Sequence, residues 1–354
     1  MREFPDIMSS FRNQRLDSMS NDTHAIEAPS GIRLNRRFSV APMMDFTDRY
    51  CRLFHRLLSK HAVLYTEMIT TGALIYGDTR RHLHYDKAEH PIALQLGGSD
   101  PEALSQSVKL ANDYGYDEVN LNCGCPSDRV QSGNFGAALM KDAPLVAKCF
   151  KAMKETSDTP ITIKHRIGID DDESYQFLSD FVGTIADAGC QTFIIHARKA
   201  WLTGLSPKEN REIPPLNYEY VYQLKRDFPD LEVILNGGIK TLEHALDILR
   251  HVDGVMMGRE AYQNPYLLSD VDQKIYQSKR PQITRKEVIR QFAQTLENEL
   301  SSGVKLSHMT RHLLGLYKGV PGGRKFRQHI SENAHYPNAG IDILFEALNH
   351  VMPQ

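Results

Sequence analysis

The stretch Asn120-Leu121-Asn122-Cys123-Gly124-Cys125-Pro126-Ser127 organises the rest of the chain. It follows an apolar run from Tyr116 and precedes a glycine-containing loop, so we predict the end of a buried strand that opens into a turn. Gly124 lets the main chain approach another molecule closely, and Pro126 removes one amide donor and fixes the local backbone angle. Such a backbone would present the Cys125 thiol to a pocket.

Two other interpretations of these cysteines compete with that one. Cys123 and Cys125 could form half of a metal site, but the sequence has no second Cys pair or Cys/His cluster at ligand spacing, so we expect no metal. Cys125 could also be an inert buried cysteine, because free Cys is among the most buried residue types. The flanking Gly124 and Pro126 argue against that alternative.

Outward from this stretch, short apolar or β-branched runs alternate with longer helical patterns. We expect eight strands, at 38–40, 62–66, 92–96, 118–121, 161–164, 192–196, 232–236 and 254–257. Apolar strands separated by helices are typical of parallel strands covered by helices, and the count fits a closed (β/α)8 TIM barrel of the α/β class. A doubly wound sheet is the structural alternative.

The pattern changes after the last predicted strand. From Thr284 onward only helical spacing is found, with Val288, Phe292, Leu296 and Leu300 on one face. The 354 residues exceed the roughly 250 of a typical barrel. We therefore predict a flexible leader at 1–36, a barrel at 37–270 and a small all-helical C-terminal domain at 283–354.

Charge is unevenly distributed along the chain. The net charge is only −2, so any nucleic-acid binding must depend on local patches. Between Leu300 and Ser331 there are six Lys or Arg residues and no Asp or Glu. This favours a surface that binds a polyanion over an ordinary solvated face.

The cellular location follows from cysteine usage and from the first residues. Five scattered cysteines suit free thiols in a reducing compartment. The segment before Gly31 has no apolar stretch of signal-peptide length, and no run approaches a membrane span. We expect a cytoplasmic protein that does not contact membranes, and we expect it to be a monomer.

Polar side chains follow nearly every predicted strand, where barrels place their catalytic groups. Asn236-Gly237-Gly238 and Gly258-Arg259 follow the last two strands and offer backbone amides and a guanidinium to a phosphate, although tight turns alone could explain the glycines. No Gly-x-Gly-x-x-Gly motif predicts a dinucleotide-binding domain. A long loop at 197–217 carries Lys208 and Arg211, which could hold an extended anion or remain solvated charges.

Together these motifs resemble the tRNA-dihydrouridine synthases. The motifs that carry the resemblance are Ala41-Pro42-Met43, Tyr65-Thr66-Glu67-Met68, Leu94-Gln95-Leu96, Asn120-Leu121-Asn122-x-Gly124-Cys125-Pro126, Ile163-Lys164, Ile195-His196-Ala197-Arg198, Asn236-Gly237-Gly238 and Gly258-Arg259. The loop at 201–212 and Ser331-Glu332-Asn333-Ala334 most resemble the A subfamily, which suggests positions 20 and 20a of tRNA. The family pattern leaves the position of Cys123 open, so we assign it no role.

The resemblance implies an FMN-dependent oxidoreductase that reduces the C5=C6 bond of uridine in the tRNA D-loop, with NADPH as the reductant. Hydride from the reduced flavin would reach C6, and Cys125 would donate the proton to C5. The target base must leave its stack to reach the flavin, which contacts over a basic surface can offset.

The resemblance also assigns individual positions. The expected cofactor-binding residues are Pro42, Met43, Met44, Gln95, Lys164, His196, Asn236, Gly237, Gly238, Gly258 and Arg259. The expected tRNA-binding residues are Asn122, Lys208, Arg211, Arg324 and Arg327.

Three other functions remain as alternatives. An FMN-dependent reductase of a free small molecule would explain the strand ends but not the basic helical segment. A noncatalytic tRNA-binding protein or folding chaperone would use the same surface without chemistry. A Schiff-base aldolase using Lys164 is disfavoured, because the neighbouring His165 and Arg166 suit anion binding equally well.

Overall fold

The computed structural model describes residues 26–27, 33–127 and 133–351. Most of the predicted leader, at 1–25 and 28–32, lies outside these residues, as do 128–132 and 352–354. Within the described part, Ile26–Glu27 (β1) and Arg33–Leu34 (β2) pair antiparallel.

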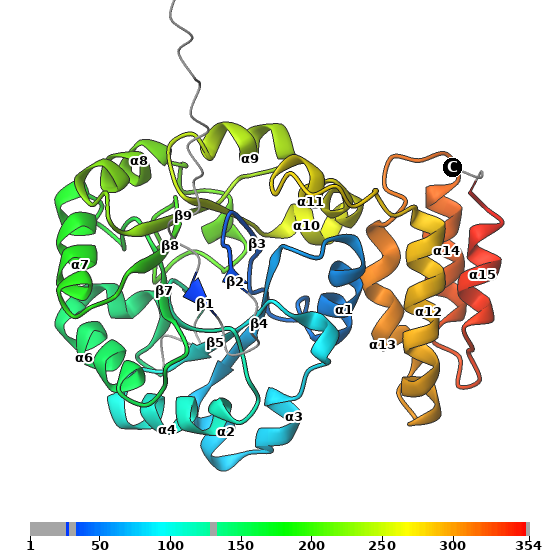
Figure 1. Cartoon of the computed structure of the whole chain (residues 1–354), viewed down its shortest axis with the longest axis horizontal. Helices are drawn as coiled ribbons and strands as arrows, with labels where there is room; N and C mark the ends of the chain where they lie inside the picture. Colours follow the sequence, from blue (N-terminus) through cyan, green and yellow to red (C-terminus); the bar gives the residue numbers. More distant parts are fainter. Residues whose placement is uncertain (1–25, 28–32, 128–132, 352–354) are drawn as a thin grey trace, which may run out of the picture.

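Eight parallel strands close a barrel in the order β10-β3-β4-β5-β6-β7-β8-β9 (Figure 1). They are β3 (Phe38–Val40), β4 (Val63–Thr70), β5 (Ile92–Gly97), β6 (Glu118–Cys123), β7 (Ile161–Arg166), β8 (Thr192–His196), β9 (Glu232–Asn236) and β10 (Gly254–Met257). The predicted (β/α)8 barrel is therefore confirmed, and the doubly wound sheet is wrong.

Several strands continue further than their apolar runs. β6 and β7 pair as far as Asn122 with Lys164 and Cys123 with His165, so polar residues take part in the ladder. β4 extends to Thr70 because a register shift between Tyr65 and Met68 restores its pairing with β5. The side chains expected in loops after these strands are thus held by strand backbone.

Helices cover the outside of the barrel (Figure 1). They are α1 (Arg49–Leu58), α2 (Thr71–Tyr76), α3 (Thr79–Leu83), α4 (Pro101–Asn112), α6 (Ala143–Lys154), α7 (Tyr175–Asp187), α8 (Tyr218–Asp227), α9 (Leu242–Ile248) and α10 (Arg259–Gln263). α4 begins at Pro101, and Asp100 caps it by accepting a hydrogen bond from the Ala103 amide.

The interior of the barrel is unusually polar. Successive side chains of a strand point to opposite faces, so Val119, Leu121 and Cys123 of β6 pack outward in the main apolar core. The alternate residues Glu118 and Asn120 are fully buried and belong to the inner face. Among the described residues, a small apolar cluster separate from the main core packs with this inner face: Leu34, Ala41, Val63, Tyr65, Ala93, Ile194, Ile234 and Met256.

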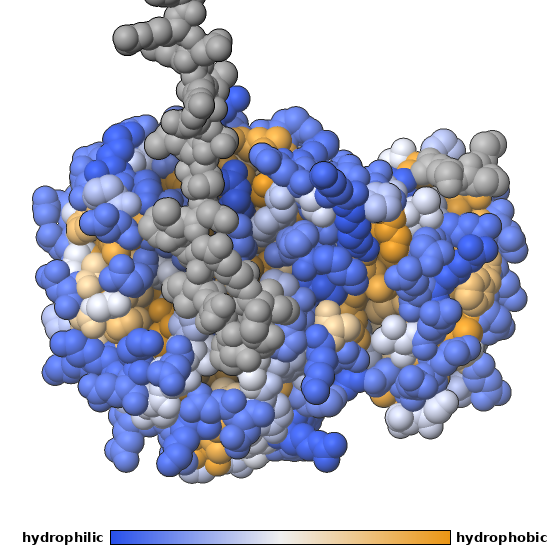
Figure 2. All heavy atoms as spheres, in the orientation of Figure 1, coloured by the Kyte–Doolittle hydropathy of each residue, from blue (hydrophilic) through white to orange (hydrophobic). Residues whose placement is uncertain are grey.

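The C-terminal part is helical and forms a bundle beside the barrel, coloured gold to red in Figure 1. Its helices are α12 (Arg285–Ser301), α13 (Leu306–Thr310), α14 (Gly323–Asn333) and α15 (Asp342–Leu348), preceded by α11 (Val271–Lys274). Much of the face drawn in Figure 2 is hydrophilic on both parts. None of the helices within the described ranges has the length and apolar character that a membrane crossing needs.

Ion pairs connect this bundle to the barrel. Arg311 contacts Asp48 at 2.6 Å, and Lys318 contacts Glu260 at 3.1 Å. Arg49 also pairs with Glu299 of α12. Two of the six basic residues counted between Leu300 and Ser331, Arg311 and Lys318, therefore have acidic partners on the barrel.

Candidate active site

The Cys125 turn is fixed on both sides. The amides of Cys125 and Gly124 donate to Asn122 Oδ1 over 2.9 and 3.0 Å. Arg166 Nε donates to the Gly124 carbonyl oxygen over 2.9 Å. Cys125 is the one cysteine of the five that is not buried, so its thiol is held at a defined place with access to the barrel mouth.

Amide side chains form the floor beside this turn. Asn122 Nδ2 donates to Gln95 Oε1 over 2.9 Å, and Gln95 Nε2 donates to Asn120 Oδ1 over 2.8 Å. All three belong to adjacent strands and are buried. The structure thus brings together Cys125 and two residues assigned by the resemblance, Gln95 and Asn122.

Polar and basic side chains form a wall on the next strands. Lys164 Nζ is 3.1 Å from Asn236 Oδ1, and His196 pairs in register with Asn236. Burial, and then the charge of Arg166, lower the pKa of Lys164 to about 7. Burial, followed by Arg166 and Lys164, lowers the pKa of His196 well below its usual value, so this imidazole is neutral at physiological pH.

Glycines complete the wall without side chains. Gly237 has φ +117°, and a Cβ there would lie 2.7 Å from His196 Cδ2, so the position requires glycine. A Cβ on Gly258 would be 4.0 Å from Met43 Sδ, which places the β10 end next to the β3 end. Pro42 and Met43 are half-buried there, and Met44 is exposed.

Four arginines converge near the mouth, and their roles differ. Arg259, the expected phosphate ligand, is paired with Glu212 at 2.5 Å and also donates to the Arg211 carbonyl oxygen. Arg198 Nε and Arg211 Nε are buried, and neither has a hydrogen-bond partner within the described residues. Buried donors without acceptors fit an anionic group at the mouth, such as the phosphate of a bound FMN.

Arg166 has a different role from the one its sequence position suggests. Its Nη1 donates to the carbonyl oxygens of Lys199 and Asn210 over 2.9 and 3.0 Å. His165 points the other way and packs between Phe181 and Phe193. The interpretation that both suit anion binding is therefore wrong for His165, which lies in the outer core. Arg166 faces the mouth and also joins two loops.

The long loop after β8 is folded around Asn210. This buried side chain donates to the Trp201 carbonyl oxygen over 2.9 Å and accepts from the Trp201 amide over 2.7 Å. Lys208 is exposed on this loop, and Arg211 is half-buried. Sequence reasoning missed Asn210, although a short polar residue between Pro207 and Pro214 is a recognisable signal for a loop-stabilising amide.

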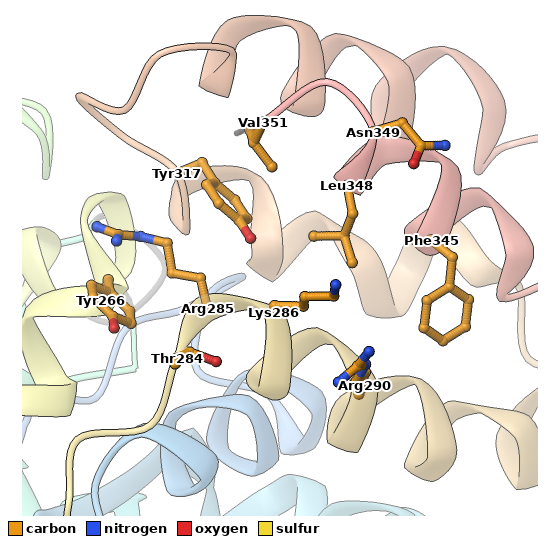
Figure 3. Close-up of a pocket in the computed structure, with 10 residues that line it drawn as sticks. All are labelled: Tyr266, Thr284, Arg285, Lys286, Arg290, Tyr317, Phe345, Leu348, Asn349 and Val351. Carbon is orange, nitrogen blue, oxygen red and sulfur yellow. The ribbon is translucent and has the colours of Figure 1, made fainter. Parts of the chain in front are cut away.

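The helical segment carries further basic residues. Arg324 and Arg327 are exposed on the first turns of α14, and no ion pair joins either of them to another described residue. A cavity of about 460 Å³ lies between α12 and α15 (Figure 3). At its edge the Arg285 guanidinium stacks 3.6 Å from the centre of the Tyr266 ring, and Lys286 and Arg290 line it. No local sequence pattern predicts this cavity.

Solved structures with a similar backbone support the barrel. An old yellow enzyme homologue from Zymomonas mobilis matches with a TM-score of 0.51 and 13% identity, over 74% of this chain and 93% of that one. A structure of a 2-naphthoyl-CoA reductase complex matches with a TM-score of 0.52 and 12% identity, over 69% of this chain and 51% of that one. At these identities the likeness concerns the fold alone.

Sequence relatives are much closer. The tRNA-dihydrouridine(20/20a) synthase of Escherichia coli K12 is 58% identical over 332 residues, 94% of this chain and 96% of its own. The Vibrio cholerae protein of the same name is 59% identical over 313 residues, 88% of this chain and 95% of its own. The model of the family described as dihydrouridine synthase matches residues 39–351. By that match and these identities, the chain belongs to the dihydrouridine synthase family of flavin-dependent oxidoreductases.

Proposed function

We propose that this chain reduces the C5=C6 bond of uridines 20 and 20a in the tRNA D-loop, with bound FMN and with NADPH as reductant. The names of the relatives motivate the choice of positions. The observation that carries the chemistry is the Cys125 turn, a half-exposed thiol beside a wall of anion-binding groups. The protein acts as a monomer in the cytoplasm, where its cysteines stay free.

The residues of the mouth fit FMN. Its phosphate would meet Gly237, Gly238, Gly258 and Arg259, with His196 as a neutral donor. Its pyrimidine edge would meet Gln95 and Lys164. Pro42, Met43 and Met44 would line it from the β3 side. Bound FMN, once reduced by NADPH, would supply hydride to the uracil ring. The residues of the chain would bind and orient the flavin and the base, and would donate the proton.

Cys125 supplies the proton. When hydride reaches C6, negative charge develops at C5, and an acid must stand within hydrogen-bond reach of that carbon. The Asn122 and Arg166 contacts hold the Cys125 backbone still, so Sγ–H is oriented before the base arrives. Lys164, which pairs in register with Asn122 on the adjacent strand, would stabilise negative charge on the reduced flavin.

Two regions would bind the RNA. Lys208 and Arg211 lie on the loop beside the mouth, and Arg324 and Arg327 lie on α14. We treat 37–270 as the catalytic unit and 283–354 as the RNA-binding unit. A small-molecule reductase would have no use for exposed cations on a separate helix, which is why tRNA is preferred as the substrate.

The test is mass spectrometry of D-loop uridines after incubation of tRNA with the protein, FMN and NADPH. We expect a two-hydrogen mass gain with wild type. Cys125→Ala should keep the flavin spectrum and tRNA affinity and lose about 10² to 10⁴ in rate, the usual contribution of a positioned acid. Flavin binding without tRNA reduction would favour a small-molecule reductase. Wild-type turnover in Cys125→Ala would remove the acid assignment.

A further inference from the structure

A buried carboxylate lies below the Cys125 turn, on the same strand. Glu118 is fully buried, and its Oε2 accepts from Arg36 Nε over 2.6 Å. A carboxylate paired with a guanidinium can only accept hydrogen bonds. Its Oε1 accepts from Tyr65 Oη and from Thr162 Oγ1, each over 2.6 Å. The single proton of the Thr162 hydroxyl must therefore be donated in the hydrogen bond to Glu118.

This constraint determines the orientation of the amides above it. Because the Thr162 proton is committed, its oxygen can only accept, and Asn120 Nδ2 donates to it over 2.8 Å. Asn120 must then turn its oxygen to Gln95, whose Nε2 donates to it over 2.8 Å. Gln95 in turn presents Oε1 to Asn122 Nδ2, 2.9 Å away.

The last amide in the series holds the catalytic turn. With Nδ2 committed to Gln95, Asn122 offers Oδ1 to the amides of Gly124 and Cys125. The opposite orientation would place an NH2 group against two N–H donors and leave buried donors without acceptors. Each such donor would destabilise the fold, because it has lost its hydrogen bonds to water without gaining a partner in the protein.

We propose that the charge of Glu118 fixes the orientation of these amides, and that Thr162 and Asn120 are positioning residues for Gln95 and for the Cys125 turn. The series is directional, since every member donates toward Glu118 and accepts from the residue above. It rests on the proposed function only in that Gln95 contacts FMN. The link to Cys125 is independent of any cofactor.

The barrel contains a second, similar set of hydrogen bonds from Arg36 that does not reach the Cys125 turn. Arg36 also pairs through Nη1 with Glu232 Oε2, at 2.8 Å. Thr192 Oγ1 donates to the same Glu232 oxygen over 2.9 Å. In the described part of the chain, no side-chain amide donates to Thr192. Thr162 and Thr192 are thus both buried threonines that donate to a glutamate paired with Arg36. Only Thr162 belongs to a series of hydrogen bonds that reaches the Cys125 turn.

The experiment compares Thr162→Val with Thr192→Val. Both replacements keep the side-chain shape and remove one hydroxyl beside a carboxylate, so both should lower the unfolding temperature. Iodoacetamide labelling of the native protein reports on Cys125, because the other four cysteines are buried. Titration with FMN, monitored by the visible spectrum of the flavin, gives the FMN affinity and so reports on Gln95, which is proposed to contact FMN.

We expect Thr162→Val to accelerate Cys125 alkylation at least about fivefold and to weaken FMN binding about tenfold, the equivalent of about 1.4 kcal/mol. Thr192→Val should remain within about twofold of wild type in both measurements, and Thr162→Ser should restore them. Equal behaviour of the two valine variants would overturn the proposal.

A second pair guards against misfolding of the valine variants. Glu118→Gln and Glu232→Gln each leave Arg36 one carboxylate, but only the first allows the amide series to reverse. Only Glu118→Gln should therefore change Cys125 alkylation, and the same change in both would contradict the proposal. If wild type fails to bind FMN, the cofactor assignment fails, whereas the alkylation comparison still decides the role of Thr162.

Discussion

Replacement of Arg166 by lysine should separate the positioning of Cys125 from the stability of the barrel. Arg166 is buried and donates to three carbonyl oxygens, those of Gly124, Lys199 and Asn210. Burial lowers its pKa to about 10, so it remains charged at neutral pH. Lysine keeps the charge but can reach at most one of the three acceptors.

The structure gives the size of the effect. Two lost hydrogen bonds at about 1 kcal/mol each should lower the free energy of unfolding by about 2 kcal/mol in urea. Because one of them holds the turn of Cys125, the thiol should shift, and we expect kcat for uridine reduction to fall at least about tenfold.

Arg56→Lys is the matched control. Arg56 is also buried, has its pKa lowered to about 10 by burial, and donates only to carbonyl oxygens. Those acceptors, among them Ala62 and Pro91, lie at the amino ends of β4 and β5, the opposite end of the barrel from Cys125. We expect Arg56→Lys to lose at least as much stability and to keep kcat within about twofold. A similar loss of kcat in both variants would refute the positioning role of Arg166.

Two further predictions concern binding. The pKa of Lys164, about 7 in the free protein through burial and Arg166, should rise beside anionic FMN, so FMN binding takes up a proton. The affinity for FMN should then fall by up to about tenfold per pH unit above pH 7. FMN titrations at several pH values should show this dependence in wild type and not in Lys164→Met. A pH dependence that persists in Lys164→Met would contradict the placement of Lys164 beside FMN. Double replacement Arg324→Gln/Arg327→Gln should weaken tRNA binding and reduce the slope of log affinity against log salt by about 2. Arg226→Gln/Arg250→Gln, which removes one exposed arginine from α8 and one from the turn after α9, should leave the slope unchanged. Equal effects of the two pairs would argue against an α14 contact.

The fold was predictable because its determinants are local. Each strand is marked by its own apolar run, and each helix by spacing and caps such as Asp100 before Pro101. The ends of the strands were less predictable, because residues such as Asn122 and Arg166 break the apolar pattern while their backbone stays in the ladder.

The types of residue at the site were predictable from the sequence, but the contacts that each residue makes were much less so. His165 and Arg166 are adjacent in sequence, and only the strand register shows that one faces the outer core and the other the mouth. Asp48 neutralises Arg311 across 263 positions of sequence, a pairing that no local pattern reveals. The order of donors from Glu118 to Cys125 likewise depends on three strands whose registers are fixed only in the closed barrel.

The ion pairs between the barrel and the helical bundle have a consequence for substrate selection. Asp48 and Glu260 follow the carboxyl ends of β3 and β10, so the bundle is attached at the same end of the barrel as Cys125. The distance from α14 to the thiol is therefore set by the protein and not by the RNA. If a folded RNA contacts both α14 and the Cys125 turn, as proposed, the nucleotide that reaches Cys125 would be selected by its position in the three-dimensional shape of the RNA and not by its neighbours in sequence.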